Sequence, residues 1–414
     1  MNITYGCIGE VLKHSFSKEI HNALADYDYK IIEIPRDKLA DFANEKNFKA
    51  INVTIPYKEA IMPFMYSIDE HAKAIGSVNT VVNREGKLYG YNTDFYGMSM
   101  LLRHAGISLL GKKIAILGTG GTSKTAYAVA KAEGAREILT VSRKKSESAI
   151  TYDELYENHT DTEVIINTTP VGMYPNICAS AVDIKSFPSL VGVIDAVYNP
   201  LRSSLISDAK EAGIKAEGGL YMLVAQAVKA SEFFINTVYD EKRLDEVFAK
   251  TMRDKENIVL IGMPASGKST VGKSLSKELN RAFFDTDAMI EEKYGKSIPE
   301  IFALWGEKKF REIECEAVCE ASAKTGVVIA TGGGAILNSG NVKNLKKNGR
   351  LYFLDRPLDK LTPTDDRPLS KSVDAIKALY EKRYPIYTAA ADKIIVADEG
   401  ILEVVGKITE DFCK

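Results

Sequence analysis

Short apolar runs alternate with longer helical stretches along the whole chain. Apolar runs spaced in this way are typical of βαβ units, so the pattern predicts an α/β protein with mainly parallel sheets. The predicted strands are Ala50–Ile55, Lys113–Leu117, Ile138–Val141, Val164–Asn167, Gly192–Asp195, Ile258–Ile261, Gly326–Ala330 and Leu351–Leu354.

Two of these strands, Lys113–Leu117 and Ile258–Ile261, run directly into glycine-rich turns. The two turns differ in design, and one sheet rarely needs two phosphate-binding turns. The pattern therefore predicts two nucleotide sites in separate domains. Between them, the polar residues 250–257 follow a predicted helix at 243–249, so we expect a short linker and a boundary near residue 254.

Composition narrows the class of partner. The 414 residues carry a net charge of -2, so no large basic field favours nucleic acid or an anionic membrane surface. The N-terminus lacks the pattern of a signal peptide, and no apolar stretch reaches the length of a membrane span. Five scattered cysteines suit reduced thiols. We therefore expect a cytoplasmic protein that binds small molecules and no nucleic acid beyond nucleotides; its oligomeric state stays open.

The first glycine turn contains Gly118, Gly120 and Gly121 and opens a helix of small residues. Backbone N–H groups and a helix N-terminus in this layout bind a pyrophosphate. The last glycine of the usual pattern is replaced by Ser123, so the turn alone is a weak signal. The next strand ends in a polar and basic run where an NAD enzyme would carry an acidic residue, which favours NADP. This run begins with Ser142, Arg143 and Lys144.

Polar clusters precede this turn. Lys58 follows a predicted strand closely, and nearby segments supply hydroxyl, amide and carboxylate groups. Each alone is typical of a surface lysine, a helix cap or a turn. Together they supply the hydroxyl, amide, carboxylate and ammonium groups that are needed to bind a polyhydroxylated acid. The residues are Ser15, Ser17, Asn52, Thr54, Lys58, Asn79 and Asp94.

These motifs, in collinear order over residues 1 to about 250, resemble the shikimate dehydrogenase family. The resemblance implies hydride transfer between NADP and the ring of shikimate or 3-dehydroshikimate, with Lys58 as proton donor and acceptor and Asp94 fixing its orientation. It also implies that Tyr198 and Gln226 reach the substrate. On the cofactor side it implies Asn167, Met173 and Gly219. Ser146 and Glu147 stand where the family often has a further basic residue.

The second glycine turn has the complete G-x-x-x-x-G-K-[ST] spacing between a strand and a helix, which is a strong signal for a phosphate-binding loop. Its backbone would wrap the phosphates of ATP, Lys268 would reach the β and γ oxygens, and Ser269 would hold Mg²⁺. The residues assigned to the loop are Gly262, Ala265, Ser266, Gly267, Lys268, Ser269 and Thr270.

The motifs that follow, over residues 256 to about 400, resemble shikimate kinase. The resemblance implies that Asp285 lies in the Mg²⁺ shell, that Asp287 contacts the acceptor hydroxyl, and that Arg367 descends with a lid onto the transferring phosphoryl group. The implied substrate contacts are Arg311, Gly332, Gly333, Gly334 and Arg383. The stretch around Arg367 looks short for a lid.

The sequence thus predicts a two-domain dehydrogenase, with an α/β substrate domain and a Rossmann-like NADP domain, followed by a P-loop kinase domain with a parallel sheet. The predicted ranges are 1–100 for the substrate domain, with helices of 220–250 returning to it, 101–250 for the NADP domain, 251–256 for the linker and 257–414 for the kinase. We expect reduction of 3-dehydroshikimate with NADPH and then phosphorylation of shikimate with ATP. Two alternatives stay open: a quinate or shikimate dehydrogenase joined to a kinase for a related acid, and a ligand-sensing regulator built from these domains.

Overall fold

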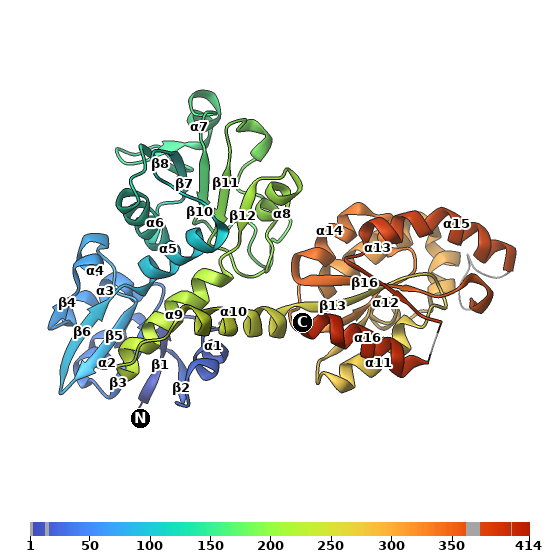
Figure 1. Ribbon diagram of the computed structural model, residues 1–414, viewed down its shortest axis with the longest axis horizontal. Helices are drawn as coiled ribbons and strands as arrows, with labels where there is room; N and C mark the ends of the chain where they lie inside the picture. Colours follow the sequence, from blue (N-terminus) through green and yellow to red (C-terminus); the bar gives the residue numbers. More distant parts are fainter. Residues whose placement is uncertain (1–2, 13–15, 362–372, 399) are drawn as a thin grey trace. The chain divides into compact units, whose positions relative to one another are not determined.

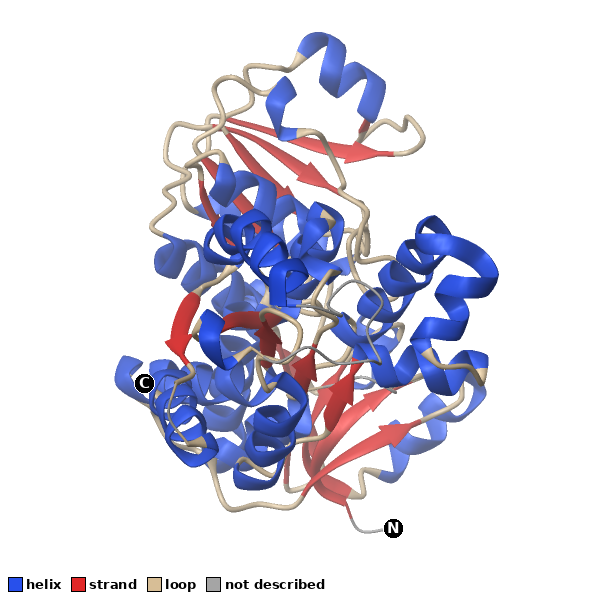
Figure 2. Ribbon diagram, turned by 90° about the vertical axis from the view of Figure 1, so that its right-hand side faces the viewer, coloured by secondary structure: helices blue, strands red, loops and turns tan. Residues whose placement is uncertain are grey.

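The computed structural model describes residues 3–12, 16–361, 373–398 and 400–414. They divide into two compact units: residues 1–199 with 203–251, and residues 200–202 with 252–414. Helices flank the strands of both units (Figure 2). In the part of the chain that the structure describes, no helix is long and apolar enough to cross a membrane. We describe each unit by itself.

The first sheet of the N-terminal unit is mixed, with the order β2-β1-β3-β5-β6-β4 (Figure 1). Strands β2, β1 and β3 are parallel, whereas β5 is antiparallel to both β3 and β6. The β5–β6 hairpin turns through Glu85 and Gly86, which both have positive φ, as a two-residue hairpin turn requires. The strands are β1 (Ile3–Gly9), β2 (Tyr29–Glu33), β3 (Phe48–Val53), β4 (Ser67–Ile68), β5 (Thr80–Arg84) and β6 (Lys87–Tyr91).

Helices from both ends of the unit cover this sheet. Helix α9 packs against α1, β3 and β5, so the chain returns to its first sheet after completing the second. Arg243 of α10 donates to the backbone oxygen of Ala23 at the end of α1. The helices are α1 (Ser17–Leu24), α2 (Leu39–Glu45), α3 (Tyr57–Ala60), α4 (Glu70–Ile75), α9 (Leu220–Ile235) and α10 (Glu241–Lys255), with 3-10 turns at Arg36–Lys38 and Met62–Phe64.

The second sheet of this unit is parallel throughout, with the order β12-β11-β10-β7-β8-β9. The chain runs outward from β7 to β9 and then returns to run outward the other way from β10, so β7 and β10 flank a topological switch point, where such sheets bind ligands. The strands are β7 (Lys113–Leu117), β8 (Glu137–Ser142), β9 (Ile150–Thr151), β10 (Val164–Asn167), β11 (Gly192–Asp195) and β12 (Lys215–Glu217). The helices are α5 (Thr93–Ala105), α6 (Gly121–Ala132), α7 (Tyr152–Asn158) and α8 (Ser204–Glu211), with a 3-10 turn at Ile184–Ser186.

The C-terminal unit is a parallel sheet between two helical layers, with the order β14-β15-β13-β16-β17. Alternate residues of β13 enter opposite cores, one with α13 and α14 and the other with α11 and α16 (Figure 1). The strands are β13 (Asn257–Ile261), β14 (Phe283–Asp285), β15 (Val328–Ala330), β16 (Gly349–Asp355) and β17 (Lys393–Val396). The helices are α11 (Lys268–Glu278), α12 (Thr286–Tyr294), α13 (Ile298–Ser322), α14 (Ser339–Asn348), α15 (Val373–Ala390) and α16 (Ile401–Cys413), with 3-10 turns at Ala335–Leu337 and Leu358–Lys360.

Two of the predicted domain boundaries fall inside helices of the structure. The expected linker at 251–256 is helical as far as Lys255, because the polar residues after position 250 include good helix formers and no glycine or proline. Only Glu256 separates α10 from β13. The expected boundary between residues 100 and 101 falls inside α5, which carries the chain from the first sheet to the second without a break.

Candidate functional sites

Lys58 and Asp94 form an ion pair, with 2.6 Å between Nζ and Oδ2. Lys58 lies on the short helix α3, one turn beyond β3, and Asp94 lies in the first turn of α5. Asn92 caps α5 by accepting from the Phe95 amide, and this cap fixes the start of the helix. Both charged side chains are mostly buried, at 19% and 12% exposed. The pair therefore presents an oriented ammonium group in a site largely shielded from water.

Hydrogen bonds connect the neighbouring polar side chains. The Asn79 carboxamide oxygen accepts from the Thr93 amide at 2.7 Å and from the Thr80 hydroxyl at 3.1 Å. Gln226 of α9 lies close to the same threonine, Thr93, and donates to the Leu223 carbonyl. The predicted residues Asn79 and Gln226 are thus linked through Thr93, the first residue of α5.

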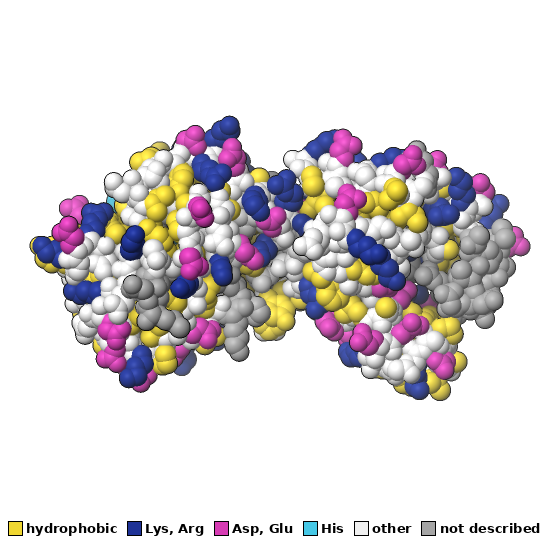
Figure 3. All heavy atoms as spheres, turned by 90° about the horizontal axis from the view of Figure 1, so that it is seen from below, with side chains coloured by type: hydrophobic (Ala, Val, Ile, Leu, Met, Phe, Trp, Pro, Cys, Tyr) yellow, Lys and Arg dark blue, Asp and Glu magenta, His cyan; other side chains and the backbone are white. Residues whose placement is uncertain are grey.

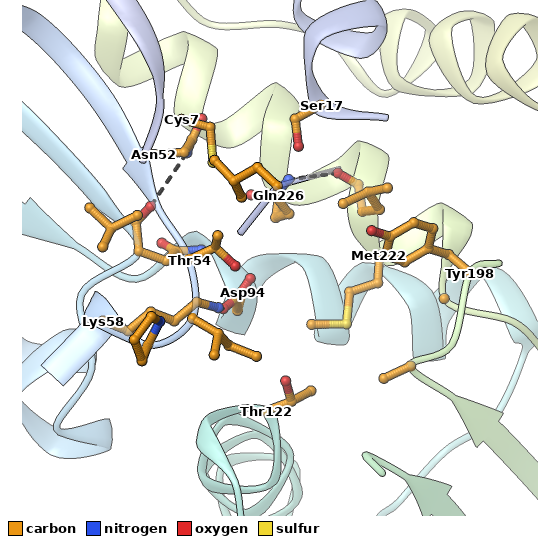
Figure 4. Close-up of a pocket in the computed structure, with 18 of the residues that line it drawn as sticks. Cys7, Ser17, Asn52, Thr54, Lys58, Asp94, Thr122, Tyr198, Met222 and Gln226 are labelled. Atoms are coloured by element: carbon orange, nitrogen blue, oxygen red, sulfur yellow. Dashed lines mark hydrogen bonds and ion pairs between the residues drawn. The ribbon is translucent and has the colours of Figure 1, made fainter. Parts of the chain in front are cut away.

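One cavity of about 690 Å³ collects these groups (Figure 4). Figure 4 shows Lys58 and Asp94 side by side on one wall, Tyr198 and Met222 on another, and Thr122 at the tip of α6. The lining includes nearly every residue predicted to touch the substrate and two predicted for the cofactor. These predicted residues are Ser17, Asn52, Thr54, Lys58, Asn79, Asp94, Met173, Tyr198, Gly219 and Gln226.

Two other lining residues, Cys7 and Met222, received no role in the sequence analysis. Cys7 enters the cavity because it pairs with Asn52 across parallel strands β1 and β3. Met222 enters it one turn before Gln226 on α9. The only signal for such positions is strand register or helical spacing next to a known site residue. Burial raises the pKa of Cys7 to about 12, so this thiol is neutral.

The first glycine turn lies at the switch point between β7 and β10. Gly118 has φ of 111°, and a Cβ at this position would meet Thr168 after β10. The space beside Gly120 and Gly121 is open, and α6 begins there with its amides unpaired by a side-chain cap. Backbone N–H groups at a helix N-terminus bind anions, so the turn fits a pyrophosphate.

Polar residues at the neighbouring strand ends have distinct environments. After β8, the side chains of Arg143 and Lys144 are exposed, whereas Lys145 pairs with Glu154. Ser142 makes a short hydrogen bond to the Lys144 backbone. The two exposed cations fit a 2′-phosphate better than two ribose hydroxyls.

Asn167 is fully buried at the end of β10. Its amide donates to Asp195 at 2.9 Å, and its oxygen accepts from Thr169. Burial raises the pKa of Asp195 to about 6, opposed by hydrogen bonds from Ser203, Val197 and Asn167. In this structure the Asn167 side chain connects the end of β10 to Asp195 at the end of β11. A direct contact between Asn167 and the cofactor would replace its hydrogen bonds to Asp195 and Thr169.

The second glycine turn adopts a closed phosphate-binding loop. Gly262, Ala265 and Gly267 have positive φ, which curls the backbone around the Lys268 ammonium. The Lys268 Nζ donates to the backbone oxygens of Gly262 and Met263 at 2.9 and 2.8 Å. Ser266 contributes a third, longer contact at 3.5 Å. Lys268 is buried, so its charge is concentrated inside the loop.

Ser269 and Asp285 bring two oxygen atoms to one point at the mouth of the loop. The Ser269 hydroxyl donates to Asp285 Oδ2 at 2.5 Å, while Asp285 Oδ1 caps α12 through the Asp287 amide. Hydroxyl and carboxylate oxygens suit Mg²⁺, which takes only one or two protein carboxylates beside substrate phosphates. Among the described residues no group of three or more His, Cys, Asp or Glu side chains could hold a metal by itself.

The predicted substrate contacts of the C-terminal unit converge on the Gly332–Gly334 segment after β15. A Cβ at Gly332 would meet the Asp287 carboxylate, and one at Gly334 would meet the Arg311 guanidinium. Arg383 is buried and donates to the Gly333 carbonyl at 3.0 Å. Arg311 is held by Glu314 at 2.9 Å, and burial raises the pKa of Glu314, with Arg311 lowering it. Two guanidinium groups and one carboxylate thus face the same glycine segment.

Two predicted residues, Ser15 and Arg367, lie outside the residues that the structure describes.

Comparison with known proteins assigns the N-terminal unit. Residues 7–81 match the family model of the shikimate dehydrogenase substrate binding domain. Shikimate dehydrogenase (NADP(+)) of Clostridium perfringens is 36% identical over 262 residues, which are 59% of this chain and 96% of that protein. The chain belongs to the shikimate dehydrogenase family.

Solved structures agree with this family assignment. Shikimate dehydrogenase 1 from Peptoclostridium difficile has a TM-score of 0.56 and 36% identity, and the match covers 60% of this chain and 97% of that one. A chorismate mutase/shikimate 5-dehydrogenase fusion protein from Clostridium acetobutylicum has a TM-score of 0.58 and 34% identity, and covers 61% and 97%. Shikimate 5-dehydrogenase of Thermus thermophilus, solved in complex with NADP(H) and shikimate, has a TM-score of 0.54 and 26% identity, and covers 60% and 99%.

The rest of this family member matches a second enzyme family. Residues 264–413 match the family model of shikimate kinase. The chain is therefore a fusion of a shikimate dehydrogenase and a shikimate kinase domain, which confirms the resemblance noted from its motifs. Both halves of the chain match families of enzymes that use nucleotides.

Proposed function

We propose that the N-terminal unit reduces 3-dehydroshikimate to shikimate with NADPH, and that the C-terminal unit phosphorylates shikimate to shikimate 3-phosphate with ATP and Mg²⁺. The observation that carries the first half is the Lys58–Asp94 ion pair, buried in a cavity that a nucleotide-binding helix also lines. The convergence of Asp287, Arg311 and Arg383 on one glycine segment carries the second half.

In the reductive step, Lys58 acts as general acid. NADPH, when bound, would supply a hydride to the carbon of the ring ketone, whose oxygen would then take up negative charge. The Lys58 ammonium gives a proton to that oxygen, and the neutral amine regains a proton from solvent; oxidation runs the same transfer backwards. Asp94 accepts a hydrogen bond from Lys58 and keeps its Nζ directed into the cavity. Ser17, Asn52, Thr54, Asn79, Tyr198 and Gln226 would hold the carboxylate and hydroxyls of the ring.

In the phosphoryl transfer step, this chain supplies positioning and charge. Lys268 and the loop backbone would neutralise the phosphates of ATP, and Ser269 and Asp285 would hold Mg²⁺. Asp287 would accept the proton of the attacking hydroxyl. Arg311 and Arg383 would bind the substrate carboxylate, because guanidinium groups match carboxylates in geometry and charge.

On the face in Figure 3, Lys and Arg side chains are interspersed with Asp and Glu, and no single sign dominates. Nucleic acid partners need a concentrated basic field, which this face lacks. All five cysteines are free, as expected for the cytoplasmic location that we include in this proposal.

A coupled assay on the full chain tests the proposal. With 3-dehydroshikimate, NADPH and MgATP present, we expect NADPH consumption followed by formation of shikimate 3-phosphate, both detected in one reaction. Replacing NADPH with NADH at equal concentration should lower the initial rate, because Arg143 and Lys144 favour the 2′-phosphate. A folded protein that forms no phosphorylated product from either 3-dehydroshikimate or shikimate would overturn the kinase half; one that consumes no NADPH would overturn the dehydrogenase half.

A further inference from the structure

A buried tyrosine outside every recognised motif contacts the substrate cavity indirectly. Tyr29 lies at the start of β2, is 0% exposed, and donates its hydroxyl to Asn52 Oδ1 at 2.7 Å. In the sheet order β2-β1-β3, the tyrosine reaches across β1 to a side chain of β3. Asn52 itself lines the cavity and is 7% exposed. Tyr29 therefore contacts Asn52, a residue of the cavity lining, without lining the cavity itself.

The hydrogen bonds of Asn52 define which way its carboxamide faces. Its amide nitrogen donates to the Thr80 hydroxyl at 3.2 Å and to the Asn79 carbonyl at 3.4 Å, which uses both of its hydrogens. Its oxygen accepts from Tyr29, so both ends of the carboxamide are hydrogen-bonded. Without the tyrosine hydroxyl, only the two longer bonds of the amide nitrogen would hold the Asn52 side chain in its place in the cavity lining.

Packing holds the Tyr29 ring in position. His21 of α1 stacks on it with ring centroids 4.0 Å apart and an interplanar angle of 9°. His21 is in turn held by the Tyr27 hydroxyl, 2.6 Å from its Nδ1. Burial raises the pKa of Tyr29 well above its usual value, so its hydroxyl is protonated and available as a donor.

We propose that Tyr29 is a positioning residue for the dehydrogenase site: its hydroxyl holds the Asn52 carboxamide in the orientation in which Asn52 binds the hydroxylated ring of the substrate. The inference rests on the proposed function of the N-terminal unit. It assigns Tyr29 an effect on affinity for the hydroxylated acid and none on the nucleotide, since the tyrosine lies on β2 at the edge of the first sheet and the glycine turn follows β7 of the second sheet.

Tyr29→Phe, with Tyr89→Phe as matched control, tests the assignment. Both changes remove one tyrosine hydroxyl from the first sheet, but Tyr89, on β6, packs edge-on against Tyr66 and has no hydrogen bond to Asn52 among the described contacts. For Tyr29→Phe we expect KM for 3-dehydroshikimate to rise about two- to tenfold, the range of one hydrogen bond, with KM for NADPH unchanged and kcat reduced less than KM is raised. For Tyr89→Phe the substrate KM should stay within about twofold of the wild type.

A double-mutant comparison separates positioning from general loosening of the fold. If Tyr29 acts through Asn52, adding Tyr29→Phe to an Asn52→Ala variant should leave the substrate KM where Asn52→Ala alone puts it. An additional rise would overturn the proposal, as would equal effects of the two phenylalanine variants. A wild-type chain that does not reduce 3-dehydroshikimate would instead refute the proposed function, so the two failures are distinguishable. Kinase activity of the same chains reports the amount of intact protein in each assay.

Discussion

At the scale of single residues, the N-terminal unit buries two titratable groups whose pKa values are displaced in opposite senses. Burial lowers the pKa of His21 to about 3, opposed by hydrogen bonding of the charged ring to the Asn52 side chain. Burial raises the pKa of Asp195 to about 6. The folded state therefore binds fewer protons at His21, and more at Asp195, than the unfolded state does. Acid destabilises the fold through the first group and stabilises it through the second.

The His21 contribution can be isolated by substitution. An unfolded histidine takes up a proton below about pH 6.5, whereas folded His21 stays neutral, so stability from this group is complete above pH 7 and is lost as pH falls. At pH 5 the loss is about 2 kcal/mol, from ~1.4 kcal/mol per pH unit. A His21→Asn variant should therefore lose less stability between pH 7 and pH 5 than the wild type. Denaturant unfolding of the full chain at the two pH values measures this difference; equal losses in both proteins would contradict a neutral, buried His21.

Most residues of the candidate sites could be predicted from the sequence, because each occurs in a motif with fixed spacing. The exceptions have a physical cause. Cys7 and Tyr29 belong to the first site only through the pairing of β1 with β2 and β3, and that register is not visible in a linear pattern. The pairing of Lys145 with Glu154 was equally hidden, and it leaves Arg143 and Lys144 as the cations at the end of β8.

At the scale of elements, the close approach of α5 and α9 sets the geometry of the dehydrogenase cavity. Helix α5 carries Asp94, and α9 carries Met222 and Gln226. The helices meet at Gly97, where a Cβ would lie 2.7 Å from the backbone oxygen of Met222. A glycine in the middle of a helix costs about 0.5–1 kcal/mol relative to alanine. Its presence here is explained by that close approach.

Gly97→Ala should therefore destabilise the N-terminal unit despite the better helix propensity of alanine. Overpacking against backbone costs about 1–3 kcal/mol, which exceeds the propensity gain. Separation of the helices should also lower dehydrogenase turnover by moving Asp94 away from Gln226, while kinase activity is retained. Ser99→Ala, on the same helix, is the matched control and should keep normal turnover. Thermal unfolding and both activities measure the outcome, and a stabilised, fully active Gly97→Ala protein would show that the helices are not in contact at this position.

Strands were predicted more reliably than the connections between them. Buried parallel strands such as β7, β10 and β13 are continuous apolar runs, which stand out in the sequence. The hairpin β5–β6 escaped the prediction because its residues alternate in polarity less clearly and its turn is Glu-Gly. Polarity alone does not distinguish a linker from an exposed helix, and the residues after Lys250 complete the polar helix α10.

At the scale of the whole molecule, the presence of two unlike glycine turns was the feature from which the division into two enzymes could be predicted. The composition could not indicate it, since a balanced charge and an ordinary apolar fraction fit one domain as well as several. What the turns predict is two separate chemistries: Lys58 and Lys268 belong to different units, and no residue is assigned to both sites. Each activity should therefore be removable alone.

Paired substitutions test this independence on the full chain. Lys58→Ala should lower reduction of 3-dehydroshikimate by about 100- to 10,000-fold, the range for loss of a general acid, while phosphorylation of added shikimate continues. Lys268→Ala should lower phosphorylation by roughly 100- to 1,000-fold and leave reduction intact, so shikimate accumulates in the coupled assay. The retained activity of each protein reports the amount of chain present, and thermal unfolding shows whether the substituted unit is folded. A loss of both activities in either variant would contradict two independent sites, and normal turnover in Lys58→Ala would remove this lysine from proton transfer.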